Sequence, residues 1–252
     1  MCVTQGEGAM KRFRALIFDV DGTLAETEEI HRRAFNDAFS YFNLRWEWDT
    51  TLYRNLLRVA GGKERIRHFT RLAPGAGHDM SDDDIAELHR FKTARFAQLI
   101  TAGECALRAG VADVIWTAAS RGQRLAIATT TSRSNVEALV STTLGTGGID
   151  LFSVIVAGDE VQQKKPAPDV YFKVLDFLGL SELECLAIED SRNGLVAASG
   201  AGIPVLITRS IYSRDDTFDG ALAIVDSLDE LVDFDLPLDQ MLSVPKCHHR
   251  GD

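Results

Sequence analysis

The chain has 252 residues, 45% of them hydrophobic, which is enough to bury one large core or two smaller ones. Its formal net charge of −10 argues against a nucleic-acid partner, because phosphate backbones require a basic surface. No apolar stretch of the sequence approaches the roughly 20 residues that span a bilayer, and the first 14 residues lack the apolar run of a signal peptide. We therefore expect a soluble protein without nucleic-acid or membrane partners, from a reducing compartment such as a bacterial cytoplasm or a plastid stroma.

Short apolar runs alternate with helix-like segments through most of the chain. Continuous apolar runs of this length are typical of strands buried on both faces of a parallel sheet. The predicted strands are 14–18, 125–128, 154–157, 185–188, 204–208 and 222–225. The predicted helices between them are 111–121, 134–144, 168–178 and 193–200. Strand alternating with helix predicts an α/β protein with a doubly wound parallel sheet.

One interval, residues 26–106, breaks this alternation. It shows helical periodicity, for example over 28–42 and 81–100, and no convincing strand. Ser81 followed by three aspartates is a good helix start, because a serine side chain caps the helix and acids suit its first turn. We expect a catalytic core formed by 12–25 and 107–236, an inserted helical domain over 26–106, and flexible termini at 1–11 and 237–252.

Polar side chains gather where the predicted strands end. In open α/β sheets, ligands bind outside the carboxyl ends of the strands, so these side chains are expected to meet at one edge. They are the carboxylates Asp19, Asp21, Glu189 and Asp190, the hydroxyls Thr129, Thr130 and Thr131, and the amine Lys165. The coincidence of all these groups at strand ends is more specific than any one of them alone.

The chemistry that suits this set is phosphoryl transfer. Clustered carboxylates repel one another unless a divalent cation neutralises them, and a few hard oxygen ligands suit Mg²⁺. Asp19 is then free to attack phosphorus, and Asp21 to protonate the leaving oxygen and later activate water. Thr129 and nearby backbone amides would hold the phosphoryl oxygens, while Lys165 offsets their negative charge.

These residues resemble the motifs of the haloacid-dehalogenase superfamily of phosphohydrolases. The matching segments, in order over about residues 15 to 208, are 19–24, Thr129, 165–169 and 189–191. The resemblance implies a Rossmann-like core with a mobile helical cap and a phospho-aspartate on Asp19. It also implies Mg²⁺ bound by Asp19, Asp190 and the backbone carbonyl of Asp21, with Glu189 supporting the site or acting as an additional ligand. Lys165 takes the family's lysine role, and Lys164 is expected to be a solvated neighbour.

The substrate is expected to be chosen by the cap. The presence of Asp21 favours a phosphoryl substrate over a halide, since a leaving alcohol needs a proton. Segments 24–36, 46–49 and 61–66 resemble the CbbY-type phosphatases, in the same branch as β-phosphoglucomutase. That type is associated with hydrolysing xylulose 1,5-bisphosphate, an inhibitor of Rubisco. We therefore expect a Rubisco-protecting sugar-phosphate phosphatase with a small phosphorylated sugar as its partner, and a monomer as in many members of this branch.

A bisphosphate substrate needs cations for its second phosphate, and the cap offers several. Lys63 and Arg65 follow a predicted turn at Gly61 and Gly62, and Lys92 lies on the last cap helix. The alternative is that all three are ordinary surface charges. The remaining candidate substrate-binding residues are Glu26, Thr27 and His31 at the core–cap junction, together with Thr130 and Thr131 beside Thr129.

Other functions remain open at this level. A phosphomutase would use the same motifs and return the phosphoryl group from Asp19 to another hydroxyl. A phosphoglycolate phosphatase would share the chemistry with a smaller substrate. A silent phosphate-binding protein would keep the fold, although fold alone would not retain a complete set of catalytic groups.

Overall fold

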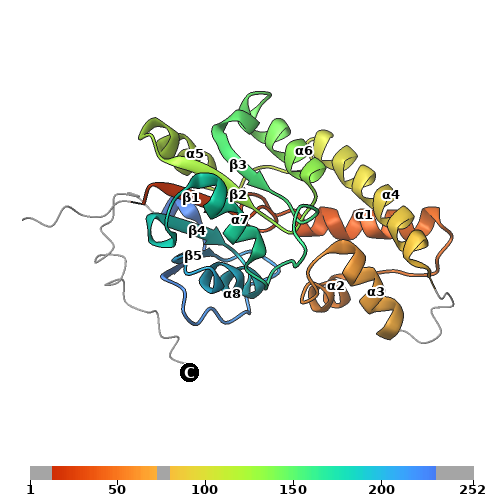
Figure 1. The fold of residues 1–252 in the computed structure, drawn as a ribbon. Coiled ribbons are helices and arrows are strands. Elements are labelled where there is room, and N and C mark those ends of the chain that lie inside the picture. The colour runs from red at the N-terminus through yellow and green to blue at the C-terminus, as the bar shows by residue number, and fades with distance from the viewer. Residues whose placement is uncertain (1–12, 73–79, 231–252) are drawn as a thin grey trace, which may run out of the picture.

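The computed structural model describes residues 13–72 and 80–230, so the predicted flexible termini lie outside the described residues. Its centre is a six-stranded parallel sheet with the order β3-β2-β1-β4-β5-β6 (Figure 1). The strands are β1 Ala15–Phe18, β2 Arg124–Ala128, β3 Phe152–Val156, β4 Cys185–Glu189, β5 Val205–Thr208 and β6 Ala223–Val225. All six predicted strands are confirmed, with ends displaced by at most two residues.

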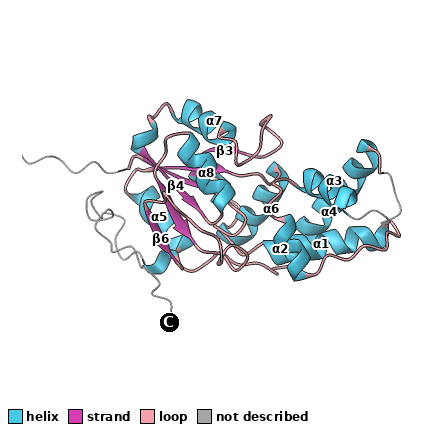
Figure 2. Cartoon of the chain, turned by 90° about the horizontal axis from the view of Figure 1, so that it is seen from below, coloured by secondary structure: helices cyan, strands magenta, loops and turns pink. Residues whose placement is uncertain are grey.

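Helices cover both faces of this sheet, as Figure 2 shows from below. They are α5 Val111–Ser120, α6 Arg133–Leu144, α7 Asp169–Leu178 and α8 Arg192–Gly200. Side chains of β1 alternate between the faces: Leu16 and Phe18 pack with α5 and α6, whereas Ala15 and Ile17 pack with α7 and α8. Burial on both faces explains why the strands are continuous apolar runs. The predicted doubly wound fold is confirmed.

In the described part of the chain, four helices lie between β1 and α5 and form a separate layer beside the sheet (Figure 1). They are α1 Glu28–Tyr41, α2 Thr50–Leu56, α3 Gly62–Leu72 and α4 Asp82–Thr101. Helix α4 begins with a full capping box. The Ser81 side chain accepts a hydrogen bond from the Asp84 N–H, and the Asp84 side chain accepts one from the Ser81 N–H. A second core of aromatic and aliphatic residues, centred on the fully buried Trp48, holds these helices together. We refer to this helical layer as the cap.

The two chain crossings between sheet and cap lie side by side. Ala25 forms isolated bridges with both Asp21 and Leu107, and the N–H of Arg108 donates to the carbonyl of Leu24 over 2.9 Å. The Arg108 guanidinium also donates to backbone carbonyls, among them that of Thr208 at 3.1 Å. The crossings are therefore fastened to each other and to the core, while the exact domain limits stay a prediction. Among the described helices, none is both long enough and apolar enough to cross a membrane.

Candidate active site

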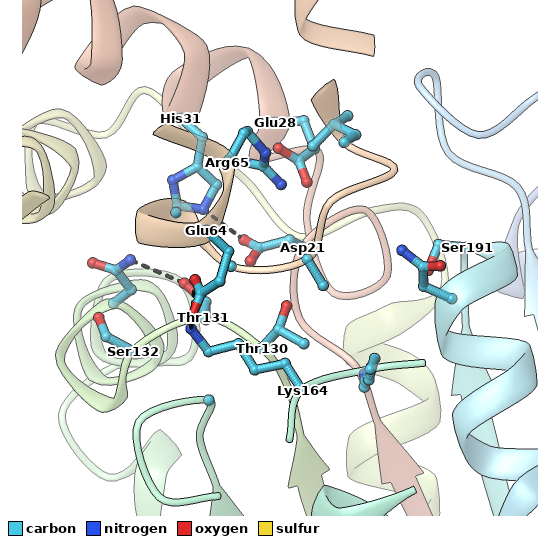
Figure 3. A pocket seen from close by; sticks show the side chains of 18 of the residues that line it. Asp21, Glu28, His31, Glu64, Arg65, Thr130, Thr131, Ser132, Lys164 and Ser191 are labelled. Atoms are coloured by element: carbon cyan, nitrogen blue, oxygen red, sulfur yellow. Dashed lines mark hydrogen bonds and ion pairs between the residues drawn. The ribbon is translucent and has the colours of Figure 1, made fainter. Parts of the chain in front are cut away.

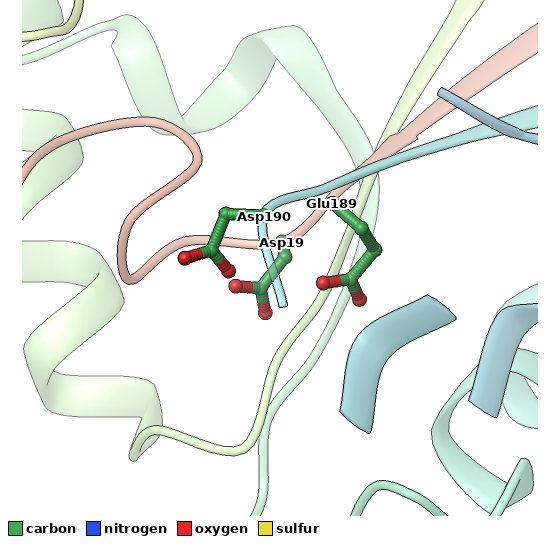
Figure 4. Close-up of side chains that lie close together, drawn as sticks. All are labelled: Asp19, Glu189 and Asp190. Carbon is green, nitrogen blue, oxygen red and sulfur yellow. The ribbon is translucent and has the colours of Figure 1, made fainter. Parts of the chain in front are cut away.

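The predicted acidic residues meet where the strand order reverses, between β1 and β4. Asp19 follows β1, Glu189 ends β4 and Asp190 comes next. All three are buried, and one carboxylate oxygen from each lies within 4.8 Å of the others (Figure 4). Ligands of doubly wound sheets bind at such a reversal point. The parallel register that pairs Phe18 with Ile188 sets the two strand ends level and brings these carboxylates together.

Lys165 joins two of these carboxylates. Its Nζ donates to Asp19 Oδ1 and to Glu189 Oε1, each over 2.6 Å, and to the carbonyl of Ala128 over 2.7 Å. Its side chain is only 4% exposed, so this is a fully enclosed ion pair. The two carboxylates raise the pKa of Lys165 against the opposing effect of burial, so the amine stays charged. Lys165 therefore lies close enough to Asp19 for its predicted role, which is to neutralise negative charge there.

Tyr171 on α7 contributes a further contact that sequence reasoning missed. Its hydroxyl donates to Glu189 Oε1, which Lys165 also contacts. The other oxygen, Glu189 Oε2, has no hydrogen-bond partner within the described part of the chain. Gly194 in the first turn of α8 lets this carboxylate approach the helix, because a Cβ there would lie 1.8 Å from Glu189 Oε2.

The donor set fits a hard divalent cation. Burial raises the pKa of Asp19 to about 7, and burial together with the charge of Asp19 raises the pKa of Asp190 well above its usual range. A bound cation would stabilise the ionised forms of Asp19 and Asp190, and it would lie close to the unpartnered oxygen of Glu189. Mg²⁺ prefers oxygen ligands, and it typically takes only a few of them from the protein and the rest from water.

Asp21 turns away from this cluster and toward the cap. Its Oδ1 accepts a hydrogen bond from Thr27 Oγ1 over 2.5 Å and lies 3.0 Å from His31 Nε2. Burial raises its pKa, but His31, Thr27 and Lys92 outweigh this effect and lower the pKa to about 2. The carboxylate of Asp21 is therefore held in its ionised form and does not belong to the cluster of Asp19, Glu189 and Asp190, so its proton-transfer role stays a prediction.

His31 connects Asp21 to the cap interior. Its Nδ1 lies 2.6 Å from Lys92 Nζ, and its ring stacks on Phe96 at 3.9 Å between centroids. Lys92 is buried, and burial lowers its pKa to about 7. The position of this lysine is set by the cap, since its amine also lies 4.6 Å from the centre of the Phe35 ring.

A cavity of about 1240 Å³ lies between cap and core (Figure 3). Asp19, Asp21, Asp190 and Lys165 line its core side. Nine basic residues line it within the described part of the chain: Arg54, Arg58, Lys63, Arg65, Arg90, Lys92, Lys164, Lys165 and Arg192. Eight acidic residues line it as well: Asp19, Asp21, Glu28, Glu64, Asp159, Asp190, Asp215 and Asp216. The basic residues suit a substrate with more than one negative group.

The threonines that follow β2 lie in different places, because Thr130 and Thr131 line the cavity and Thr129 does not. Thr130 and Thr131 line the cavity, and Asn135 Nδ2 donates to Thr131 Oγ1 over 2.9 Å. Thr129 is buried, and its hydroxyl accepts a hydrogen bond from the Thr131 N–H over 3.3 Å. Contact between the Thr129 hydroxyl and a phosphoryl oxygen stays a prediction.

The other predicted substrate-binding residues lie in two places. His31, Lys63, Arg65 and Lys92 line the cavity. Arg65 is buried and held by the carbonyl of Leu56 and the hydroxyl of Tyr53.

Two junction residues, Glu26 and Thr27, are not part of the cavity lining. Glu26 lies 3.4 Å from Arg108 and accepts a hydrogen bond from the Ile211 N–H, so it fastens the crossing. Thr27 is fully buried, and its hydroxyl donates a hydrogen bond to Asp21.

The structure also contains contacts that the sequence did not indicate. Lys164 was expected to be solvated, and this is wrong: its side chain is 22% exposed and pairs with Glu64 of the cap. Glu28 lines the cavity and accepts a hydrogen bond from Tyr53 over 2.8 Å. Glu28 is the first residue of α1, where an acid is expected because it stabilises the start of a helix. Its contact with Tyr53 could therefore not be predicted from its sequence position.

The model of the haloacid dehalogenase-like hydrolases matches residues 13–202 of the chain. Protein CbbY of Rhodobacter capsulatus is 53% identical over 209 residues, which cover 82% of this chain and 90% of that protein. The plasmid-encoded CbbY of Cupriavidus necator is 45% identical over 239 residues, 94% of this chain and 92% of that protein. A crystal structure of mutant CbbY from Rhodobacter sphaeroides in complex with xylulose 1,5-bisphosphate superimposes with a TM-score of 0.83. It is 48% identical in sequence, and the match covers 87% of this chain and 96% of that one.

Proposed function

Because the chain belongs to the haloacid dehalogenase-like hydrolases, we propose that it is a Mg²⁺-dependent phosphatase that hydrolyses xylulose 1,5-bisphosphate through an aspartyl-phosphate on Asp19. One observation carries the proposal: Lys165 Nζ lies 2.6 Å from the oxygen of Asp19 within a buried acidic cluster that opens into a cation-lined cavity. The similarity to CbbY proteins supports the substrate. Removal of a Rubisco inhibitor would then be the role of the reaction.

Asp19 acts as the nucleophile in this scheme. One of its carboxylate oxygens forms a bond to phosphorus while the bond between phosphorus and the sugar oxygen breaks. Lys165 stabilises the negative charge that Asp19 and the phosphoryl group share, because both are enclosed where the dielectric constant is low. The backbone amides at the start of α6, which follows Thr131, would bind phosphoryl oxygens.

Asp21 moves the protons. A bound anionic substrate would raise the pKa of Asp21 from about 2, because its negative charge offsets those of His31 and Lys92. The protonated carboxyl then gives its proton to the departing sugar oxygen, and the resulting carboxylate takes a proton from water as that water attacks the aspartyl-phosphate. Water's oxygen bonds to phosphorus, the bond to Asp19 breaks, and inorganic phosphate leaves. Thr27 and His31 hold Asp21 from the cap side, so its carboxyl is positioned best when the cap lies against the core.

Asp19, Asp190 and the backbone carbonyl of Asp21 would hold Mg²⁺, with Glu189 as a supporting group. The cation supplies charge neutralisation that lets Asp19 and a phosphate approach each other. Glu189 keeps Lys165 in place through a 2.6 Å contact and is itself fixed by Tyr171.

The second phosphate of the substrate would lie among the cations of the cap. Lys63 and Arg65 line the cavity from α3, and Lys92 lines it from α4. Arg65 is pre-oriented by Tyr53 and Leu56, so little side-chain freedom is lost when it binds an anion.

The test is a phosphate-release assay with purified protein, with Mg²⁺ and with a chelator. The panel contains xylulose 1,5-bisphosphate, ribulose 1,5-bisphosphate, β-glucose 1-phosphate and phosphoglycolate. We expect Mg²⁺-dependent release that is fastest from the xylulose compound. Faster phosphate release from another ester would refute xylulose 1,5-bisphosphate as the substrate. Conversion of β-glucose 1-phosphate to an isomer without phosphate release would indicate a mutase.

A further inference from the structure

An ion pair joins the cap to the loop between β3 and α7. The Nζ of Lys164 donates to both carboxylate oxygens of Glu64, each over 2.9 Å. Glu64 lies in the first turn of α3, and Lys164 lies 100 residues further along the chain, in the core. Both line the cavity between cap and core, and Figure 3 shows their side chains pointing toward one another. The pair therefore bridges the space into which the substrate fits.

The backbone beside this pair is shaped to receive it. Gly61, directly before α3, has a φ of 91°, a left-handed conformation that side chains other than glycine rarely adopt. A Cβ at this position would lie 2.2 Å from Glu64 Oε2 and 2.7 Å from Lys164 Nζ. The two charged groups thus occupy the space that any side chain at Gly61 would need.

The core partner is the neighbour of a catalytic residue. Lys165, next to Lys164, places its Nζ 2.6 Å from Asp19 Oδ1. On the other side of Lys164, the N–H of Gln163 donates to Asp169 over 3.3 Å, which ties the loop to the start of α7. A cap residue that holds Lys164 therefore holds the segment that presents Lys165.

We propose that Glu64 is a positioning residue that docks the cap onto the Lys164–Lys165 segment while substrate is enclosed. This inference rests on the proposed phosphatase activity and adds a determinant of it. Charge–charge contact across the cavity stabilises the closed arrangement, in which Asp21 is held by the cap and water is excluded. Because the pair is partly exposed, its effect should weaken as salt screens it.

The test uses the full-length protein and four variants: Glu64→Gln, Glu64→Lys, Lys164→Glu and the double charge swap E64K/K164E. Arg67→Gln is the matched control, because Arg67 is also on α3 but pairs with Asp82 inside the cap. For Glu64→Gln we expect kcat/KM to fall at least fivefold at low salt, with the difference from wild type shrinking in about 1 M salt. The unfolding temperature should match that of Arg67→Gln, since partly exposed pairs add little stability.

The charge swap distinguishes a pairwise contact from a structural defect. We expect E64K/K164E to have a higher kcat/KM than either of its single variants. The inference is overturned if Glu64→Gln behaves like Arg67→Gln, or if the double variant is no better than both singles. All ratios are measured on the ester that the wild type hydrolyses fastest. A different preferred substrate would therefore refute the proposed function and still leave the docking contact tested.

Discussion

Lys165 and Asp19 form a buried ion pair, with the lysine Nζ 2.6 Å from the aspartate Oδ1. These residues are 146 positions apart in the chain and meet because β1 lies at the centre of the sheet. The same amine contacts Glu189, so one cation serves two enclosed carboxylates.

Replacing Lys165 with Gln should impair both stability and catalysis. Removing one partner of a buried ion pair leaves uncompensated charge and typically costs about 3 kcal/mol. Phosphate release should fall at least about a hundredfold, because charge on the transferring group is no longer offset. Urea unfolding in chelator and steady-state assays measure the two effects. Lys173→Gln is the control, since this partly exposed lysine pairs with Glu160 and should cost less than about 1 kcal/mol.

Mg²⁺ should stabilise the folded protein, and Asp190 should be required for this effect. A cation present at about 100 times its dissociation constant contributes about 2.7 kcal/mol if it binds the folded state alone. We expect thermal unfolding of the wild type to shift upward with Mg²⁺ and that of Asp190→Asn to stay unchanged. Asp215→Asn, which alters a cavity acid outside the cluster, should shift like the wild type. An equal shift in Asp190→Asn would contradict the proposed metal site.

Gly194 should tolerate no side chain. A Cβ at this position would lie 1.8 Å from Glu189 Oε2 and 2.1 Å from its Cδ, and Glu189 is fully buried and held by Lys165 and Tyr171. Gly194→Ala should lower the free energy of unfolding by about 2 kcal/mol, as overpacking does, and reduce phosphate release along with it. Gly147→Ala is the matched control, because its added Cβ would meet nothing within 4 Å. Similar behaviour of the two variants would show that Glu189 is not held as described.

His89 should make the protein sensitive to mild acid. Burial, reinforced by the nearby positive charge of Lys92, lowers its pKa from 6.5 to about 3. Below pH 6.5 the unfolded chain therefore binds a proton at this histidine that the folded chain does not, so stability falls as pH falls toward 3. Between pH 6.5 and 5 this loss amounts to about 1.6 kcal/mol. Unfolding curves of His89→Gln should lose that much less than wild type over the same interval; parallel losses would refute the assignment.

The sheet could be predicted because its strands are buried on both faces and so appear as unbroken apolar runs. The ends of those strands then identified Asp19, Lys165 and Asp190, since parallel strands place their carboxyl ends at one edge. Helix α4 was equally clear from Ser81 and the acids that follow it. In these places local sequence and global fold point to the same structure.

Contacts between cap and core could not be predicted, because they depend on how two separately formed units meet. Lys164 looks like a solvated lysine until α3 brings Glu64 to it. Gly62 was expected to belong to a turn, but it is the first residue of α3, since only Gly61 has the left-handed backbone. Glu26 was expected to face substrate, yet Arg108, 82 residues away, draws its carboxylate to the crossing.

The most direct test compares wild type with Asp19→Asn on xylulose 1,5-bisphosphate in the presence of Mg²⁺. Asparagine keeps the size of the side chain and removes the nucleophilic carboxylate. We expect rapid phosphate release by wild type, none by a folded Asp19→Asn protein, and a phosphorylated Asp19 in rapidly quenched wild type. Phosphate release by Asp19→Asn at the wild-type rate would contradict the proposed role of Asp19.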